Sequence, residues 1–320
     1  MPIRKALTIF CVGLFLILFL LPATGEAQTL KVTLLGTGDP VPRMSRFGPS
    51  TLVQTDKDTF LFDCGRGVAQ RIFQLRMPIG QVTDLFLTHL HSDHVVGISD
   101  FWLTGWIPVI GARKTPLQVW GPVGTKEMVS SLEKAFQADF RIRTQDENLP
   151  PEGYTIIARD IKEGIIYEKN GVKITAFEVE HFPVKIEPCL GYRIDYAGRS
   201  VVLSGDTRYS ENLIRFSKGA DLLVHEVIAA KEEMLSNPVI QRIMAHHVSP
   251  EEAGKVFAQV KPKMAVYTHV VLFGPNPMTV PTPADVITLT RKTYSGPLEV
   301  GEDLMVIEVG DEVKVTRPSR

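Results

Sequence analysis

Short apolar runs that end in metal-ligand residue types constrain the fold of this chain more than any other feature. Five runs are bounded by Gly, Asp or Pro and are too continuous for half-exposed strands, namely 32–36, 84–89, 201–206, 221–226 and 264–269. Continuous apolar runs of this length are typical of strands that are buried on both faces. The chain is therefore expected to build its core around sheets.

Helical patterns lie between several of these runs. Three segments fit helices, namely 68–76, 126–138 and 249–260. The last opens with Ser249, has a proline next and Glu252 three residues on, which is a capping box. Residues 174–181 and 189–203 fit antiparallel hairpin strands. Because strands and helices alternate in both halves, we predict a mixed α/β layered sandwich.

Histidines and carboxylates occur where the apolar runs end. These terminal residues are His89, His181, Asp206, His225 with Glu226, and His269. The carboxyl ends of strands line the ligand crevice in sheets of this class, so residues far apart in sequence can converge there. The chain has 8 histidines, and the others, His91, His94, His246 and His247, flank two of these positions.

The stretch THLHSDHVVG, residues 88–97, is the densest group of such residues. His89 and His91 are spaced to point to one side of an extended segment, whereas Asp93 and His94 turn toward a neighbouring point, so the stretch can serve two metal centres. Imidazole and carboxylate ligands suit Zn²⁺, with Mn²⁺ or Fe²⁺ as alternatives. The ligands are numerous and include no clear thiolate, which favours a catalytic site over a closed structural one.

The pattern His-Leu-His-Ser-Asp-His, residues 89–94, resembles the signature of the metallo-β-lactamase fold superfamily, which continues with a later His, Asp and His. The resemblance implies an α/β fold, the αββα four-layer sandwich, over the whole mature chain. It also implies two zinc ions. Their ligands would be His89, His91 and His181 for one ion, Asp93, His94 and His269 for the other, and Asp206 bridging both.

Other stretches resemble one branch of the superfamily, ribonuclease Z and its arylsulfatase-like relatives. They are GTGDPVPRMSRFGPS from Gly36, FDCGRG from Phe62, GDTRYSENL from Gly205 and GADLLVHE from Gly219. Two motifs of the branch are only partly kept. The Glu of His-Glu-Ala-Thr is present as Glu226 and the His of His-Ser-Thr as His247, but the small residues that follow differ.

The mechanism that this resemblance implies is hydrolysis by a metal-bridging hydroxide. Two zinc ions can ionise a shared water and clamp both oxygens of an in-line displacement. We expect Asp93 to orient that hydroxide or take its proton, His247 to act as proton donor or cation, and Glu226 to orient His247. The alternative for Glu226 and His247 is a buried structural pair.

The substrate prediction depends on a missing segment. In ribonuclease Z a long arm that grips RNA lies between the positions matching His181 and Asp206, and here the short stretch 182–205 is mostly hairpin. The net charge of −1 and the lack of a basic tract give no extended nucleic-acid surface. We therefore predict an exported di-zinc hydrolase of small phosphodiesters or sulfate esters, with a small anionic ester as its partner. The alternatives are a ribonuclease Z-type RNA endonuclease, a lactonase or β-lactamase, and a non-catalytic metal-binding protein.

The N-terminal segment differs in kind from the rest. Arg4 and Lys5 precede an apolar run over 6–21, and small residues follow near position 27. This pattern predicts a signal peptide over 1–27, with a hydrolase domain over 28–320 in the periplasm or secreted. The alternative is an uncleaved anchor that holds the domain outside the cytoplasm, which would be the chain's only membrane contact.

Two further properties stay open in the sequence. Cys64 and Cys189 could pair in an oxidising compartment or remain separate thiols. Homodimer formation is also compatible with the sequence.

Overall fold

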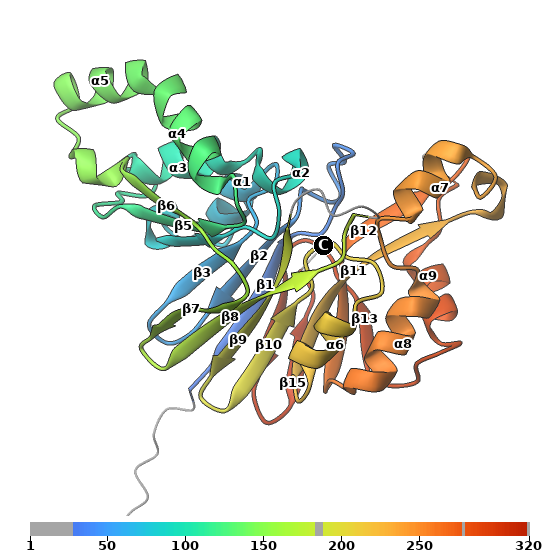
Figure 1. Ribbon diagram of the computed structural model, residues 1–320. Helices are drawn as coiled ribbons and strands as arrows, with labels where there is room; N and C mark the ends of the chain where they lie inside the picture. The colour runs from blue at the N-terminus through green and yellow to red at the C-terminus, as the bar shows by residue number, and fades with distance from the viewer. Residues whose placement is uncertain (1–27, 183–187, 277–278, 319–320) are drawn as a thin grey trace, which may run out of the picture.

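The computed structural model of the chain describes residues 28–182, 188–276 and 279–318. Within these ranges two mixed sheets lie face to face (Figure 1). In spatial order, the first sheet contains β15 (Val313–Thr316), β14 (Met305–Val309), β1 (Leu30–Gly36), β2 (Ser50–Gln54), β3 (Thr59–Phe62), β4 (Asp84–Phe86), β5 (Leu117–Gly121) and β6 (Ile156–Asp160). The second contains β13 (Leu298–Val300), β12 (Met264–Phe273), β11 (Leu222–Ala230), β10 (Arg199–Leu203), β9 (Cys189–Tyr196), β8 (Val172–Val179) and β7 (Gly164–Lys169).

Each sheet contains a group of parallel strands whose carboxyl ends all lie at one edge of the sandwich. In the first sheet the parallel pairs are β3–β4, β4–β5 and β5–β6. In the second they are β10–β11, β11–β12 and β12–β13. Loops that follow parallel strands meet at this edge, which is where open α/β sheets bind ligands.

Helices flank both sheets (Figure 1). Those in the first half are α1 (Val68–Gln74), α2 (Ser92–Val95), α3 (Ile98–Trp106), α4 (Thr125–Ala135) and α5 (Gln137–Gln145). Those in the second half are α6 (Glu211–Ser217), α7 (Pro238–Met244), α8 (Pro250–Val260) and α9 (Pro283–Thr290). Separate apolar clusters join α1, α3 and α4 to the first sheet and α6, α8 and α9 to the second. The predicted αββα sandwich is confirmed.

The predicted helices agree with the structure except at one break. The helix after Ser249 has both hydrogen bonds of the predicted capping box. The helix predicted over 126–138 instead ends at Ala135, and α5 begins at Gln137. Together α4 and α5 project from the body of the molecule (Figure 1).

Two strands run further than the sequence suggested. The apolar runs were expected to end at Glu226 and His269, but β11 continues to Ala230 and β12 to Phe273. The ligand-type residues therefore lie inside these strands. A shift of register between the two strands at this point makes the placement compatible with continued pairing.

The predicted signal peptide, residues 1–27, lies outside the described residues, so export stays a prediction. Within the described ranges no helix has the length and apolar character needed to cross a membrane. Cys64 and Cys189 are both buried, and no disulfide joins them in this part of the chain.

Candidate active site

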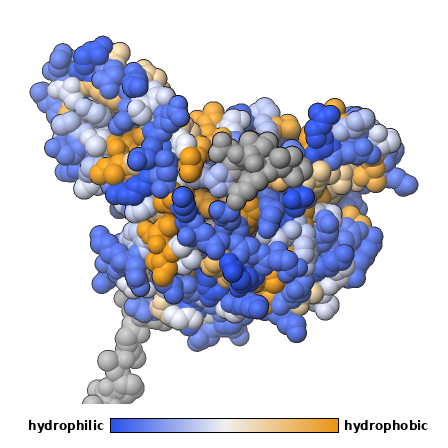
Figure 2. All heavy atoms as spheres, viewed as in Figure 1, coloured by the Kyte–Doolittle hydropathy of each residue, from blue (hydrophilic) through white to orange (hydrophobic). Residues whose placement is uncertain are grey.

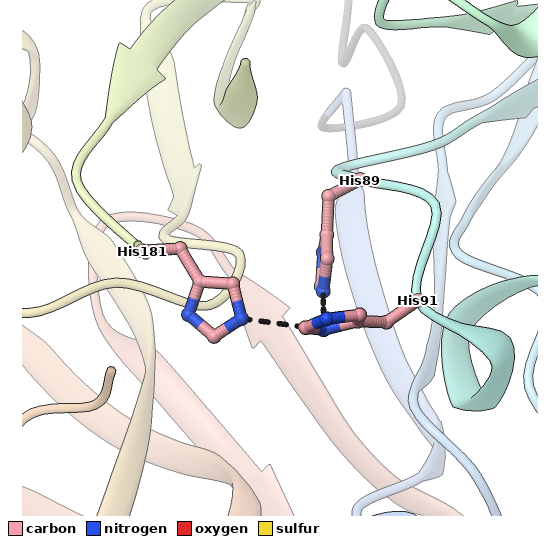
Figure 3. A group of neighbouring side chains, drawn as sticks. All are labelled: His89, His91 and His181. Carbon is pink, nitrogen blue, oxygen red and sulfur yellow. Dashed lines mark hydrogen bonds between the residues drawn. The ribbon is translucent and has the colours of Figure 1, made fainter. Parts of the chain in front are cut away.

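Three histidines from two segments point their ring nitrogens at a common point (Figure 3). Nε2 of His89 lies 2.9 Å from Nδ1 of His91, which lies 3.3 Å from Nε2 of His181. Tetrahedral zinc with bonds of about 2.0–2.1 Å holds its ligand nitrogens about 3.3 Å apart. The spacing of the three nitrogens therefore fits the coordination shell of one ion.

A second group lies beside the first and contains carboxylates. Nε2 of His269 lies 3.3 Å from Oδ2 of Asp93, and Nε2 of His94 lies 3.7 Å from the same oxygen. Oδ2 of Asp206 is 3.9 Å from Nε2 of His89, 3.4 Å from that of His94 and 3.2 Å from that of His269. Asp206 thus stands between the two groups, as expected for a bridging carboxylate.

The loop after β4 supplies four of these side chains because a short helix begins inside it. His91 is in extended backbone just before α2, and the helix then turns the side chains of Asp93 and His94 away from His91. His94 N donates to the His91 carbonyl, and Cys64 N donates to the His94 carbonyl. The loop is therefore fixed to the segment that follows β3.

A bulge inside the second sheet brings in His269. His225 pairs with Tyr267 and Val227 with Val270, so β12 has two residues opposite the single residue Glu226. His269 has a φ of 42°, in the left-handed region. This conformation costs a non-glycine residue about 1 to 3 kcal/mol and is typical of functional sites. The bulge aims His269 into the site without ending the strand.

Asp206 reaches the site through a glycine turn. Gly205 has a φ of 61°, and a Cβ at this position would lie 2.6 Å from the Leu190 carbonyl oxygen. The turn therefore needs the conformational freedom and the small size of glycine. The Ser204 hydroxyl donates to the Gly205 carbonyl at this turn.

Outer hydrogen bonds set the ring tautomers. Nδ1 of His181 lies 2.9 Å from the His246 carbonyl oxygen, which can only accept, so the proton is on Nδ1 and Nε2 keeps its lone pair. Nδ1 of His94 lies 2.8 Å from Oδ2 of Asp63, which has the same effect. Nε2 of His94 is buried and has no hydrogen-bond partner among the described residues. Burial would lower the pKa of His94, but the carboxylates of Asp206 and Asp63 raise it well above its usual value, so a metal ion bound at Nε2 would displace a proton.

The ionisation of the first group also fits metal binding. Burial lowers the pKa of His181 to about 4 and holds the pKa of His89 well below its usual value. Burial alone would raise the pKa of Asp206, but the neighbouring His269 and His94 hold it well below its usual value. Neutral imidazoles beside an ionised carboxylate are the forms that bind divalent cations.

A second pair, Glu226 and His247, faces both groups. Oε1 of Glu226 lies 3.0 Å from Nδ1 of His247 and accepts from the backbone N–H of Thr207, also at 3.0 Å. Burial would lower the pKa of His247, but the buried carboxylate of Glu226 raises it to about 9. The His247 ring centroid is 5.0 Å from that of His181 and 5.5 Å from that of His269. A protonated imidazole therefore stands next to both groups.

The comparisons with known proteins agree with this geometry. A family model described as the beta-lactamase superfamily domain matches residues 58–270. The chain belongs to the metallo-β-lactamase superfamily. It is 37% identical over 287 residues to a protein named ribonuclease Z in Mycobacterium marinum, covering 88% of this chain and 99% of the relative. A ribonuclease Z of Mycolicibacterium gilvum is 36% identical over 286 residues, covering 88% and 96%.

Solved structures of the superfamily show the same fold. The metallo-β-lactamase fold protein YhfI of Bacillus subtilis has a TM-score of 0.67 and 21% identity, covering 88% of this chain and 99% of that one. Human tRNase Z, short form, has a TM-score of 0.64 and 20% identity, with the same coverage. Together with the relatives named above, they confirm the predicted resemblance. As a member of this superfamily the chain is a metal-dependent hydrolase that acts on ester bonds.

The predicted arylsulfatase-like function and small anionic ester substrate are wrong. The curated relatives favour the ribonuclease Z alternative, and human tRNase Z is among the structural neighbours. The prediction relied on the short stretch 182–205 and on the missing basic surface. The M. marinum relative aligns over 99% of its length with 88% of this chain, so no long insertion distinguishes the two proteins. The absence of a long arm therefore does not argue against this family for a chain of this size.

Two tryptophans that follow the histidine-rich loop in sequence lie in the core and do not line the site. Trp102 and Trp106 lie on the buried face of α3, and their ring N–H groups donate to the carbonyls of Tyr154 and Pro150, respectively. They are core residues and not pocket walls. Nη1 of Arg46 donates to the Gly301 carbonyl, so this guanidinium is engaged inside the fold.

Sequence reasoning missed two residues that hold the candidate ligands in place. Asp63 follows β3 and accepts from the backbone N–H of Thr88 at 2.8 Å besides contacting His94. Oγ1 of Thr88 lies 3.0 Å from Nδ1 of His89. The available signal was the Asp that ends the apolar strand in FDCG, a position equivalent to the strand ends that were noticed.

Proposed function

We propose that this chain is a ribonuclease Z-type endonuclease that hydrolyses phosphodiester bonds in RNA. The observation that carries the proposal is the convergence of two ligand groups around Asp206, with His247 beside both. The relatives named ribonuclease Z support RNA as the substrate. Two divalent metal ions, which we take to be zinc, would supply electrophilic stabilisation of phosphate oxygens and activation of water.

The proposed ligands keep the predicted grouping. His89, His91 and His181 would hold one ion, and Asp93, His94 and His269 the other, with Asp206 shared. Asp93 would also accept a hydrogen bond from the attacking water. Burial favours the neutral acid, but the hydrogen bond from His269 and the nearby His94 lower the pKa of Asp93, so its carboxylate stays ionised.

His247 is proposed to protonate the leaving oxygen of the RNA. Its pKa of about 9 keeps the ring protonated at neutral pH, as a general acid requires. Glu226 is entirely buried and would hold the ring toward the site through the 3.0 Å contact at Nδ1, which leaves Nε2 to face the substrate. Glu226 is thus a positioning residue, and His247 is the catalytic acid.

Arginines at the rim are proposed to contact the RNA backbone. Arg66 is exposed and lines a groove of about 460 Å³ together with Val96, two residues after His94. Arg208 lines a hollow of about 390 Å³ beside His181. Guanidinium groups match phosphate oxygens in geometry and charge. Figure 2 shows that this face of the molecule is mostly hydrophilic, with separate apolar patches.

A substrate panel tests the proposal. The zinc-loaded full chain is given a transfer RNA precursor with a 3′ extension, bis(p-nitrophenyl) phosphate and p-nitrophenyl sulfate in parallel reactions. We expect cleavage of the precursor and no turnover of the sulfate ester. Hydrolysis of the sulfate ester with the RNA left intact would refute the proposed substrate, and His91→Ala controls for contaminating nucleases.

A further inference from the structure

A buried carboxylate, Asp303, joins three segments at the edge of the site. Its Oδ1 accepts from the backbone N–H of Thr37 at 2.9 Å and from the Thr37 hydroxyl at 2.8 Å. Its Oδ2 accepts from the backbone N–H of Phe47 and from Nη2 of Arg71, both at 2.7 Å. Asp303 is 7% exposed. A carboxylate with four donors in a buried place fixes each of those donors firmly.

The position of Asp303 connects the two sheets. It lies between β13, in the second sheet, and β14, in the first. Thr37 follows directly after β1, and its carbonyl oxygen accepts from the backbone N–H of Val270 at 2.9 Å. Val270 follows His269 in the chain. Two hydrogen bonds therefore separate the Asp303 carboxylate from the backbone that carries a proposed metal ligand.

Among the seven proposed ligands, only His269 has a left-handed backbone. Its left-handed φ of 42° persists only if the surroundings hold it. The carbonyl of Thr37 holds the next peptide N–H, and Asp303 holds Thr37 on two sides. Arg46 adds a further contact from its Nη1 to the Thr37 hydroxyl at 2.6 Å.

We propose that Asp303 is a positioning residue for the second metal ion, acting through Thr37 and Val270 on His269. The inference rests on the ligands assigned in the proposed function and does not depend on the RNA substrate. Within the described part of the chain, the hydrogen bonds of His89, His91 and His181 involve none of Asp303, Thr37 and Val270. Loss of the Asp303 carboxylate should therefore weaken one ion and spare the other.

Zinc competition against a chromogenic chelator tests this in the full chain. Asp303→Asn keeps the shape of the side chain but removes its charge. The bonds that Oδ1 accepts from Thr37 then lose the charge that strengthens them, or are broken if the amide nitrogen faces Thr37. We expect one of two zinc ions to bind roughly 10- to 100-fold more weakly, the range for residues that support ligands, and the other to be unchanged. The zinc-binding step that is weakened should be the one that His269→Ala abolishes and that His91→Ala retains.

Two more variants guard against a purely structural explanation. Asp311→Asn removes a carboxylate whose side chain is 98% exposed and pairs with Arg199, so it should leave both zinc affinities unchanged. Thr37→Val removes the hydroxyl contact and keeps the carbonyl, so it should weaken the same ion by a smaller factor. This variant also provides the test if Asp303→Asn does not fold.

The outcomes separate this inference from the proposed function. Equal weakening of both ions, or lower stability with both zinc affinities unchanged, would show that Asp303 only stabilises the fold and would overturn the inference alone. Fewer than two zinc ions in the wild type would overturn the proposed metal centre and this inference with it. Selective weakening of the His269 ion supports the inference whether or not the protein cleaves RNA.

Discussion

The loop over 88–97 and the second sheet supply proposed metal ligands in different ways. In the loop, four ligands lie within six positions, and a short helix orients them without a left-handed residue among them. In the second sheet, Asp206 follows a left-handed glycine, and His269 itself is left-handed at a bulge inside β12. Ligands in a loop need only local turns, whereas a ligand within a strand needs backbone strain and outside support.

The largest effect is expected from the loop. His91→Ala removes a nitrogen that lies within 3.3 Å of both neighbouring imidazoles of the first group. We expect loss of an ion and of metal-dependent cleavage, because the remaining two histidines cannot complete the shell. Metal content by atomic emission, together with the cleavage rate, measures this. Retention of both ions would show that His91 is not a ligand.

The second-largest effect is expected at His247, where a substitution should separate catalysis from metal binding. His247→Gln removes the proposed acid but none of the seven proposed ligands. The rate should fall roughly 100- to 10,000-fold, the usual contribution of a general acid, while the metal content stays unchanged. If zinc is lost as in His91→Ala, His247 is a ligand instead of an acid.

A pH profile sharpens the role of the same pair. The wild-type rate should fall as pH rises through about 9, since the Glu226 carboxylate outweighs burial and raises the pKa of His247 to that value. Only the protonated ring can donate, so the loss lies on the alkaline side. Glu226→Gln removes the raising charge, and the alkaline fall should move to lower pH with a rate loss of roughly 10- to 100-fold. An unmoved profile would contradict this coupling.

The smallest effect concerns the turn before Asp206. Gly205→Ala should lower the free energy of unfolding by about 1 to 3 kcal/mol, because the new Cβ meets the Leu190 carbonyl in a left-handed backbone. The matched control is Gly198→Ala, where φ is 74° but nothing lies within 4 Å of the Cβ. It should cost only about 1 kcal/mol. Equal losses in urea unfolding would mean that the Leu190 contact is unimportant.

The features that could be predicted are those that depend on residues adjacent in sequence. Alternating strands and helices, the capping box at Ser249 and the loop over 88–97 all depend on neighbours in sequence. The fold and the grouping of the proposed loop ligands could therefore be predicted. The extension of β12 beyond His269 could not, because a bulge depends on register with β11 and not on the residues of β12 alone. The role of Asp63 could not be predicted either, because it depends on the contact with His94 in the folded chain.

The substrate error has a related cause. Net charge and the short stretch 182–205 describe what the chain lacks, and neither shows how a protein of this size holds RNA. Both relatives align with this chain over nearly their full length, so their size is comparable. Both are nevertheless named ribonuclease Z. Local arginines such as Arg66 leave the net charge near zero and can still meet phosphates.

Mapping the ends of the RNA product tests the central claim most directly. The zinc-loaded full chain is incubated with a 3′-extended transfer RNA precursor, and both fragments are sequenced and their termini identified. Attack by water at the phosphodiester, aided by two metal ions and His247, predicts one main cut and no 2′,3′-cyclic phosphate. An intact precursor, or a cyclic phosphate that indicates attack by the 2′-hydroxyl, would contradict the account.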